Sequence, residues 1–166
     1  ISRSKTKVVW ADLFDVDPIK KSLNEMGVPI VERPEGIDII MSFTSEDIVS
    51  IDDLTTLLSI QYKLNQYSLY LKQQLAIAKT VYNDLEDEFD RMVSNAVRDV
   101  KPARLTLTEK RNIVIQNNED LANMSVKVKD ARRKKTLLEG WIDDVNNLAE
   151  VVRQVYYRVR GWHEAD

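Results

Sequence analysis

The chain has 166 residues, 43% hydrophobic and 31% charged, so it can bury a core as one ordinary domain or as an elongated hairpin with a small appendage. It contains no cysteine, which excludes disulfides, thiol catalysis and thiolate metal sites. The net charge is -3, so attraction to nucleic acid would have to come from a local cluster of basic side chains.

The first 50 residues predict an irregular segment with a short helix and one strand. Asp17 followed by Pro18 is typical of a helix start, and Gly27 predicts the end of that helix. Two prolines between residues 29 and 36 favour an extended connection. Residues 37–43 are then expected to form a short strand or a buried extended segment. This segment is the predicted N-terminal α+β part of the chain, residues 1–50.

A long helix is predicted from about Asp52 to about Arg98. Ser50 and Asp53 resemble a capping box at its start, and Pro102 predicts its end. Side chains suited to a buried seam recur at alternating steps of four and three, which is a heptad pattern. They are Leu57, Gln61, Leu64, Ser68, Leu71, Leu75, Ala78, Tyr82, Leu85, Phe89, Met92 and Ala96.

A second long helix is predicted from about Glu109 to about Arg160, with Thr106 or Thr108 as its N-cap and Gly161 as its stop. Its seam has the same spacing: Val114, Asn117, Leu121, Met124, Val128, Ala131, Lys135, Leu138, Ile142, Val145, Ala149, Val152, Tyr156 and Val159. Residues 51–166 are therefore expected to form a mainly α, coiled-coil-like antiparallel hairpin with its turn near residues 100–107. Such a rod leaves apolar surface that self-association or the N-terminal segment must cover.

The charges of the two predicted helices are unevenly distributed. If the hairpin folds about residues 102–104, positions equally far from the turn face each other, and Lys72 and Lys79 come close to a basic run on the second helix. The expected basic band is Lys72, Lys79, Lys127, Lys129, Arg132, Arg133, Lys134 and Lys135. The acidic cluster of Asp84, Glu86, Asp87, Glu88 and Asp90 would then lie beside Glu119 and Asp120, away from the basic band.

Three interpretations of the basic band are open. It can be a solvated helical face, a site for the phosphates of nucleic acid with Tyr67, Tyr70 and Tyr82 as stacking surfaces, or a contact between subunits in which an acidic cluster meets a basic band. Asn117 and Lys135 occupy seam positions, where polar side chains can fix register or oligomeric state.

The sequence offers little for catalysis. Its four glycines are scattered and form no phosphate-binding loop, and the single histidine, His163, lies beside the C-terminus. No apolar run is long enough for a membrane span, and the N-terminus lacks the apolar region of a signal peptide. We therefore expect an intracellular protein that is not an enzyme, binds no cofactor, metal or small-molecule substrate, and does not enter a membrane.

The order of local patterns along the long helices is similar to that of a known family. The first long helix contains a stretch rich in Tyr, Leu, Gln and Lys, from Ile60 to Lys79. The second contains, in order, residues 109–111 (Glu-Lys-Arg), residues 118–121 (Asn-Glu-Asp-Leu) and the basic run. It ends with a Trp-containing apolar stretch that runs to residues 156–158 (Tyr-Tyr-Arg). In these features, over about two-thirds of the chain, it resembles the UvsY-type recombination mediators, small helical accessory proteins of large tailed bacteriophages.

This resemblance implies a ring-forming homo-oligomer in the host cytoplasm that binds single-stranded DNA without sequence preference and helps to load a recombinase. The basic band would contact the DNA backbone. The acidic net charge and the N-terminal extension depart from the family pattern. Two alternatives remain: a structural component of a virion that assembles without nucleic acid, and an adaptor hairpin that presents its N-terminal segment to a protein partner.

Overall fold

The computed structural model describes residues 21, 23–101 and 104–163, and these form helices and no strand. The chain divides into two units, residues 1–32 and residues 33–166. In the first unit a helical turn ends at Gly27, whose φ of 70° is left-handed. The Gly27 and Val28 amides donate to the carbonyls of Asn24 and Leu23, as in a Schellman motif, which confirms Gly27 as the predicted stop. The predicted start at residues 17–18 lies outside the described residues.

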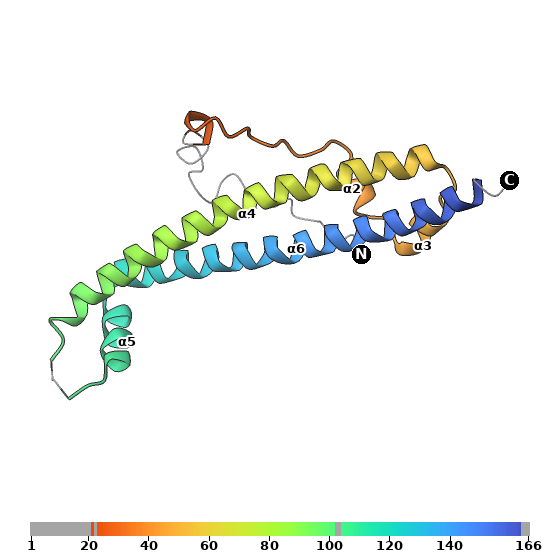
Figure 1. The fold of residues 1–166 in the computed structure, drawn as a ribbon. Helices are drawn as coiled ribbons and strands as arrows, with labels where there is room; N and C mark the ends of the chain where they lie inside the picture. Colours follow the sequence, from red (N-terminus) through yellow and green to blue (C-terminus); the bar gives the residue numbers. More distant parts are fainter. Residues whose placement is uncertain (1–20, 22, 102–103, 164–166) are drawn as a thin grey trace, which may run out of the picture. The chain divides into compact units, whose positions relative to one another are not determined.

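The second unit contains five helices among its described residues: α2 (Ile37–Ile40), α3 (Ser45–Val49), α4 (Leu54–Val97), α5 (Leu107–Asn117) and α6 (Glu119–His163). The two long helices, α4 and α6, pack against each other, and α5 lies beside them at one end (Figure 1). The expected mainly helical class and the two long packed helices are confirmed. No described helix is long and apolar enough to cross a membrane.

The strand expected at residues 37–43 is wrong, because Ile37–Ile40 forms the short helix α2. Gly36 starts it with a left-handed φ of 71°. Ile37 and Ile40 are buried, three positions apart on one helical face, whereas Ile39 points to solvent. A strand would have turned alternate residues inward, so burial of a helical face against α4 favours the helix.

The first long helix begins slightly later than expected, and its cap is a different residue. Asp53, not Ser50, is the N-cap, and its carboxylate accepts from the amides of Thr55 and Thr56. Ser50 instead ends the short helix α3, which the heptad analysis does not predict. The capping box lies one helix earlier, where the Thr44 and Asp47 side chains and amides bond reciprocally.

The second long helix is interrupted, contrary to the expectation of one continuous helix. Asn118 is extended, with φ -128° and ψ 112°, and it separates α5 from α6. Its side-chain oxygen accepts from the Leu121 amide at 3.2 Å, so Asn118 caps α6. The predicted cap at Thr106 is confirmed, since it forms a capping box with Glu109. Gly161 does not stop α6, which continues to His163.

The core of the second unit follows the heptad seams. Leu57, Leu64 and Leu71 of α4 pack with Val145 and Val152 of α6, and all five are at most 1% exposed. A second cluster joins the far end of α4 to α5 and α6: Phe89, Val93, Val114 and Leu121. α3 is attached to the opposite end by its buried Ile48 and by Arg158, which donates to the Val49 carbonyl at 2.8 Å.

Candidate functional site

The pairing of α4 with α6 decides which charges meet. Three side-chain contacts define it: Ser68 with Asn146 at 3.1 Å, Lys79 with Glu139 at 3.3 Å, and Tyr82 with Lys135 at 4.9 Å from ring centre to Nζ. Each α4 residue therefore meets a residue on α6 roughly two to three helical turns further along than a fold about residues 102–104 requires. The physical reason is that α5 and the break at Asn118 take up the chain expected to start the second helix.

This shift breaks up the expected basic band. Lys79 pairs with Glu139, about one helical turn past the end of the basic run at Lys135. Lys72 is exposed about two turns nearer the start of α4, on the side of Lys79 away from that run. Lys79 is thus held by a carboxylate at the edge of the run, and only Lys72 is clearly separated from it. What remains is a basic run on α6 alone: Lys127, Lys129, Arg132, Arg133, Lys134 and Lys135.

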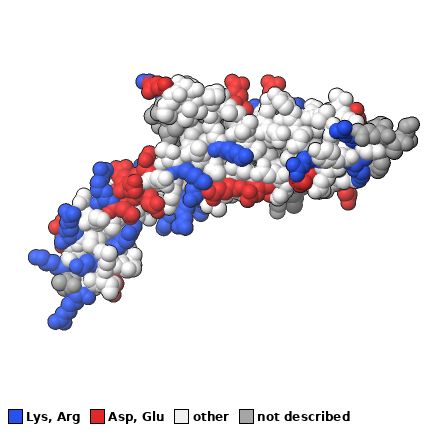
Figure 2. Space-filling view, viewed as in Figure 1, with Lys and Arg blue, Asp and Glu red and all other residues white. Residues whose placement is uncertain are grey.

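The acidic cluster of α4 lies beside this basic run, also contrary to expectation. Tyr82 marks the meeting point, because its hydroxyl donates to the Glu86 carboxylate at 2.5 Å while Lys135 lies over its ring. The bond to Glu86 raises the pKa of the Tyr82 hydroxyl, and the nearby Arg132 charge opposes that rise. Figure 2 shows acidic and basic side chains adjoining on the surface. The chain thus neutralises part of its own basic run.

Within the basic run the side chains differ in accessibility. Lys127, Lys129, Arg132 and Arg133 are exposed. Arg133 lies 3.8 Å from Asp130, one turn away on the same helix. Lys134 is partly buried, and this burial lowers the pKa of its ammonium group. The outward-facing part of the run is therefore smaller than the sequence suggests.

The three tyrosines considered for base stacking already contact other side chains of the same chain. Tyr67 is buried, which raises the pKa of its hydroxyl, and its ring stacks on Tyr70 with centres 6.0 Å apart. Tyr82 is held between Glu86 and Lys135. These contacts favour packing over stacking on unpaired bases.

The two polar seam residues behave differently. Lys135 is partly buried against Tyr82, so it does lie at the contact between α4 and α6. Asn117 is exposed at the last position of α5, so the expected seam position is wrong for this residue. The break at Asn118 turns it away from the interface.

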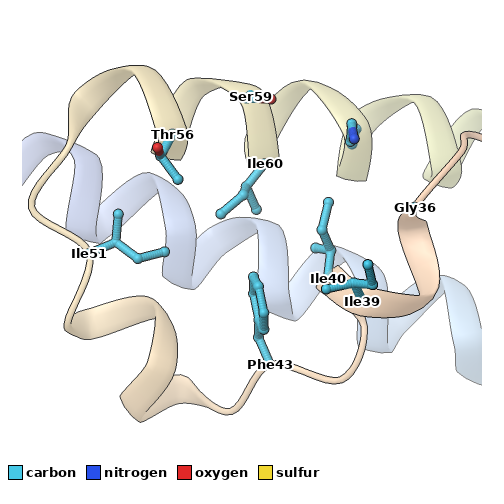
Figure 3. A pocket seen from close by; sticks show the side chains of 9 residues that line it. Gly36, Ile39, Ile40, Phe43, Ile51, Thr56, Ser59 and Ile60 are labelled. Carbon is cyan, nitrogen blue, oxygen red and sulfur yellow. The ribbon is translucent and has the colours of Figure 1, made fainter.

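An open apolar groove lies between α4 and the segment that carries α2 and α3. Its volume is about 320 Å³, and Figure 3 shows the side chains of Ile40, Phe43, Ile51 and Ile60 pointing into it. Lys63 stands at its edge, with Nζ 3.6 Å from the position that a Cβ on Gly36 would take. The heptad pattern does not predict this groove, because α2 and the segments on either side of α3, with Phe43 and Ile51, form its second wall.

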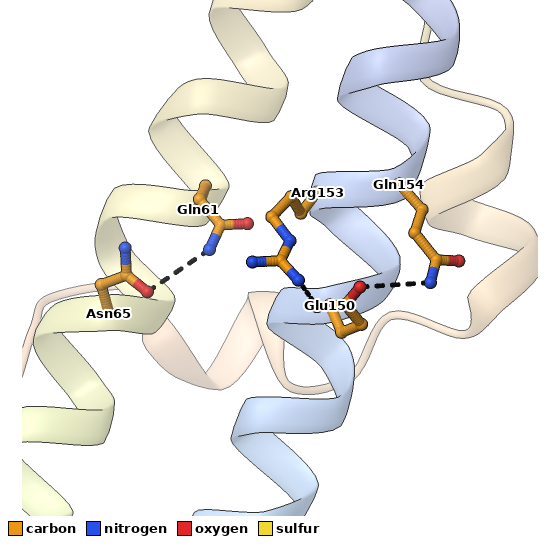
Figure 4. Close-up of polar contacts among 5 residues, drawn as sticks. All are labelled: Gln61, Asn65, Glu150, Arg153 and Gln154. Carbon is orange, nitrogen blue, oxygen red and sulfur yellow. Dashed lines mark hydrogen bonds and ion pairs between the residues drawn. The ribbon is translucent and has the colours of Figure 1, made fainter.

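Several large apolar side chains are exposed on the long helices. They are Leu58, Tyr62 and Leu69 on α4 and Val126, Leu137, Trp141 and Tyr157 on α6. Each long helix also carries polar side chains that bond to one another within that helix (Figure 4): on α4 Gln61 donates to Asn65 at 3.3 Å, and on α6 Glu150 bonds with Arg153 and Gln154. The buried Gln61 Oε1 has no partner among the described residues.

The described residues hold no group of three His, Cys, Asp or Glu side chains that could bind a metal ion. Comparison with protein-family models, with curated proteins and with solved structures finds no match. Function must therefore be inferred from the surfaces of this chain itself.

Proposed function

We propose that this protein is a non-enzymatic helical assembly protein, in which α4 and α6 form an antiparallel hairpin whose outer faces bind other protein subunits. The contacts of Ser68 with Asn146 and of Lys79 with Glu139 support the antiparallel direction, because α6 positions fall as α4 positions rise. Two helices cannot bury the apolar side chains on each other's outer faces, and in this proposal the partner subunits bury them.

One observation carries this proposal: the long helices expose large apolar side chains on faces that point away from their mutual contact. Leu69 and Val126 are each 56% exposed, and Tyr62 is 63% exposed. Scattered exposed leucines are common, but repeated ones along a long helix are typical of a protein interface. A hairpin only two helices thick has few other means of covering them.

The charges favour a protein partner over nucleic acid. The acidic cluster of α4 lies beside the basic run of α6, near Tyr82, so a phosphate backbone laid along the run would also approach carboxylates. A protein surface with both signs of charge would match the same region without this repulsion.

Single-stranded DNA binding of the UvsY type is the second candidate function. The observation that favours it is the exposure of Lys127, Lys129, Arg132 and Arg133 over less than two turns of helix. Such a cluster can release counterions from a nucleic-acid backbone without reading its sequence.

Sedimentation velocity separates the two candidates. The full chain is run alone and with a fluorescent single-stranded oligonucleotide, at low and moderate salt. Beside it run a variant with Ser at Lys127, Lys129 and Arg133, and a control with Ser at three exposed basic residues elsewhere, Arg98, Lys101 and Arg104.

We expect the protein to associate with itself and the oligonucleotide to sediment free at moderate salt in every sample. Binding that persists at moderate salt and is lost in the first variant, but kept in the control, would establish the nucleic-acid function instead. A wild type that neither self-associates nor binds the oligonucleotide would contradict both candidates.

A further inference from the structure

The outward face of α4 carries a second heptad pattern. Leu58, Tyr62, Asn65 and Leu69 follow one another at steps of four, three and four, and we call these four residues the outer seam. All are exposed, Leu58 by 51%. The seam that packs on α6, with Leu57, Leu64 and Leu71, lies on a different face of α4, roughly 130° around the helix axis. One helix therefore has two sets of positions suited to helix packing, and α6 uses only one of them.

The outer seam lies in a region of low charge, although the chain as a whole is 31% charged. From Leu54 to Asn83, α4 contains no Asp or Glu, and it contains three lysines. Of these, Lys63 lines the apolar groove and Lys79 pairs with Glu139. A solvated helix face normally carries charges, whereas depletion of charge with enrichment of aromatic residues is typical of the core of a protein interface.

Resting on the proposed assembly function, we propose that the outer seam binds the outer seam of a second copy of this chain, with the two α4 helices antiparallel about a two-fold axis. In this register Leu58 faces the partner's Leu69, and Tyr62 faces the partner's Asn65. Each copy thus places a leucine against a leucine and a polar group against a polar group.

The hydrogen bonds already formed on α4 suit this register. Asn65 accepts a bond from Gln61 through Oδ1, so its amide NH₂ group remains available as a donor. The Tyr62 hydroxyl accepts from Gln66 Nε2 at 2.7 Å and retains a second lone pair. The Asn65 amide of one copy can therefore donate to the Tyr62 hydroxyl of the other, twice in each dimer.

The charges on α4 favour an antiparallel pair of helices over a parallel one, and a second copy of this chain over a highly charged partner. An in-register parallel pair would bring the two Lys72 ammonium groups together, whereas the antiparallel register keeps them about 25 Å apart along the helix axis. A highly charged partner would bury its own charges against an uncharged face without compensation. A second copy has no charged residue at the four outer-seam positions, so this cost does not arise there.

Disulfide cross-linking tests the register, and the absence of native cysteine makes each introduced thiol unique. Leu58→Cys and Leu69→Cys variants are purified reduced, then oxidised separately and as a mixture. We expect a covalent dimer in the mixture and little in either variant alone, because two Cys side chains at position 58 would lie about 16 Å apart along the axis, too far for a disulfide. Val126→Cys, mixed with either, is the exposure-matched control and should not cross-link.

Efficient cross-linking of either variant alone, or none in the mixture, would overturn the proposed pairing. Sedimentation of a Leu58→Asp/Leu69→Asp variant then tests the face itself, against an Ile39→Asp/Leu107→Asp control, whose two apolar side chains are exposed but lie off the long helices. We expect at least a tenfold weaker self-association in the α4 variant and little change in the control, with helical circular dichroism retained in both.

The remaining outcomes separate this inference from the proposed function. If wild type and both double variants associate equally, another face makes the contact, so the inference fails and the assembly function stands. If wild type is a monomer and only the α4 variant lowers its melting temperature, the outer seam is covered by the chain's own residues. If wild type is a monomer and neither variant changes the melting temperature, self-assembly fails as well.

Discussion

The ammonium group of Lys135 on α6 lies 4.9 Å from the centre of the Tyr82 ring on α4, beside the hydrogen bond from Tyr82 to Glu86. This cation–π contact places a charged side chain inside a heptad seam, where it meets an aromatic face and a nearby carboxylate. It also fixes which turn of α6 faces which turn of α4.

Replacing Lys135 by Glu should therefore destabilise the packing of the long helices by about 1–2 kcal/mol, because it removes the cation–π contact and adds a like charge near Glu86. Lys135→Met keeps a similar apolar length and should cost less than about 1 kcal/mol. Urea unfolding followed by circular dichroism measures both. Equal destabilisation by Met and Glu would show that the charge of Lys135 plays no part.

Removing the cap of α6 should also weaken the fold. Asn118→Ala loses the bond to the Leu121 amide and should cost about 1 kcal/mol of unfolding free energy. Asn123→Ala changes the same residue type at an exposed position within α6, where alanine has the higher helix propensity, and should be neutral or slightly stabilising. An Asn118→Ala variant as stable as wild type would mean that α5 and α6 join without a cap.

Replacement of glycine by alanine should have opposite effects on stability at Gly36 and at Gly140. Gly36 has a left-handed φ, so Gly36→Ala should cost about 1 kcal/mol or more. Gly140 lies within α6, and a Cβ there would meet nothing within 4 Å, so Gly140→Ala should stabilise the protein by about 0.5–1 kcal/mol. Thermal unfolding of the two variants beside wild type measures the difference, and a shift in the same direction for both would contradict the assigned backbone geometry.

The core of the long-helix pair should be sensitive to cavity formation. Leu64 is 0% exposed, so Leu64→Ala should cost about 2–5 kcal/mol. Leu137, which is 45% exposed on α6, serves as the control, and its replacement by Ala should cost less than about 1 kcal/mol. Similar losses for both would show that Leu64 is not in a packed core.

The cap of α4 predicts a pH dependence. Hydrogen bonds from the Thr56 side chain and from the Thr56 and Thr55 amides lower the pKa of the Asp53 carboxyl. Since the folded pKa lies below the unfolded value of about 4, the stabilisation is complete above that value and is lost as pH falls through the folded pKa. Asp53→Asn keeps a capping oxygen but cannot titrate, so it should reduce the loss of stability between about pH 4 and pH 2.

Stability is measured across that pH range by urea unfolding, with Asp52→Asn as the control. Asp52 is an exposed neighbour that accepts none of the cap bonds to Thr55 and Thr56. Asp53→Asn and Asp52→Asn curves that both coincide with wild type would contradict a capping role for the Asp53 carboxylate.

Local sequence patterns are sufficient to predict the helical class, the two long helices and most of the faces that these helices bury. Steps of four and three place Leu57, Leu64 and Leu71 on one side of α4, and the burial of that side follows from the period of the helix. The same local reasoning was sufficient for Gly27 as a stop and Thr106 as a cap, because each acts on backbone groups only a few residues away.

Which charges lie next to each other depends on contacts between distant segments of the chain. The register of α4 on α6 depends on the path of the chain between them, and that path is set when α5 packs Val114 with Phe89 and when Asn118 interrupts the helix. A shift of two to three turns keeps the seams of α4 and α6 on the faces where these helices meet but exchanges the partners of Lys79 and the acidic cluster. Helical periodicity is local and can be read along one chain segment, whereas register depends on contacts between distant segments.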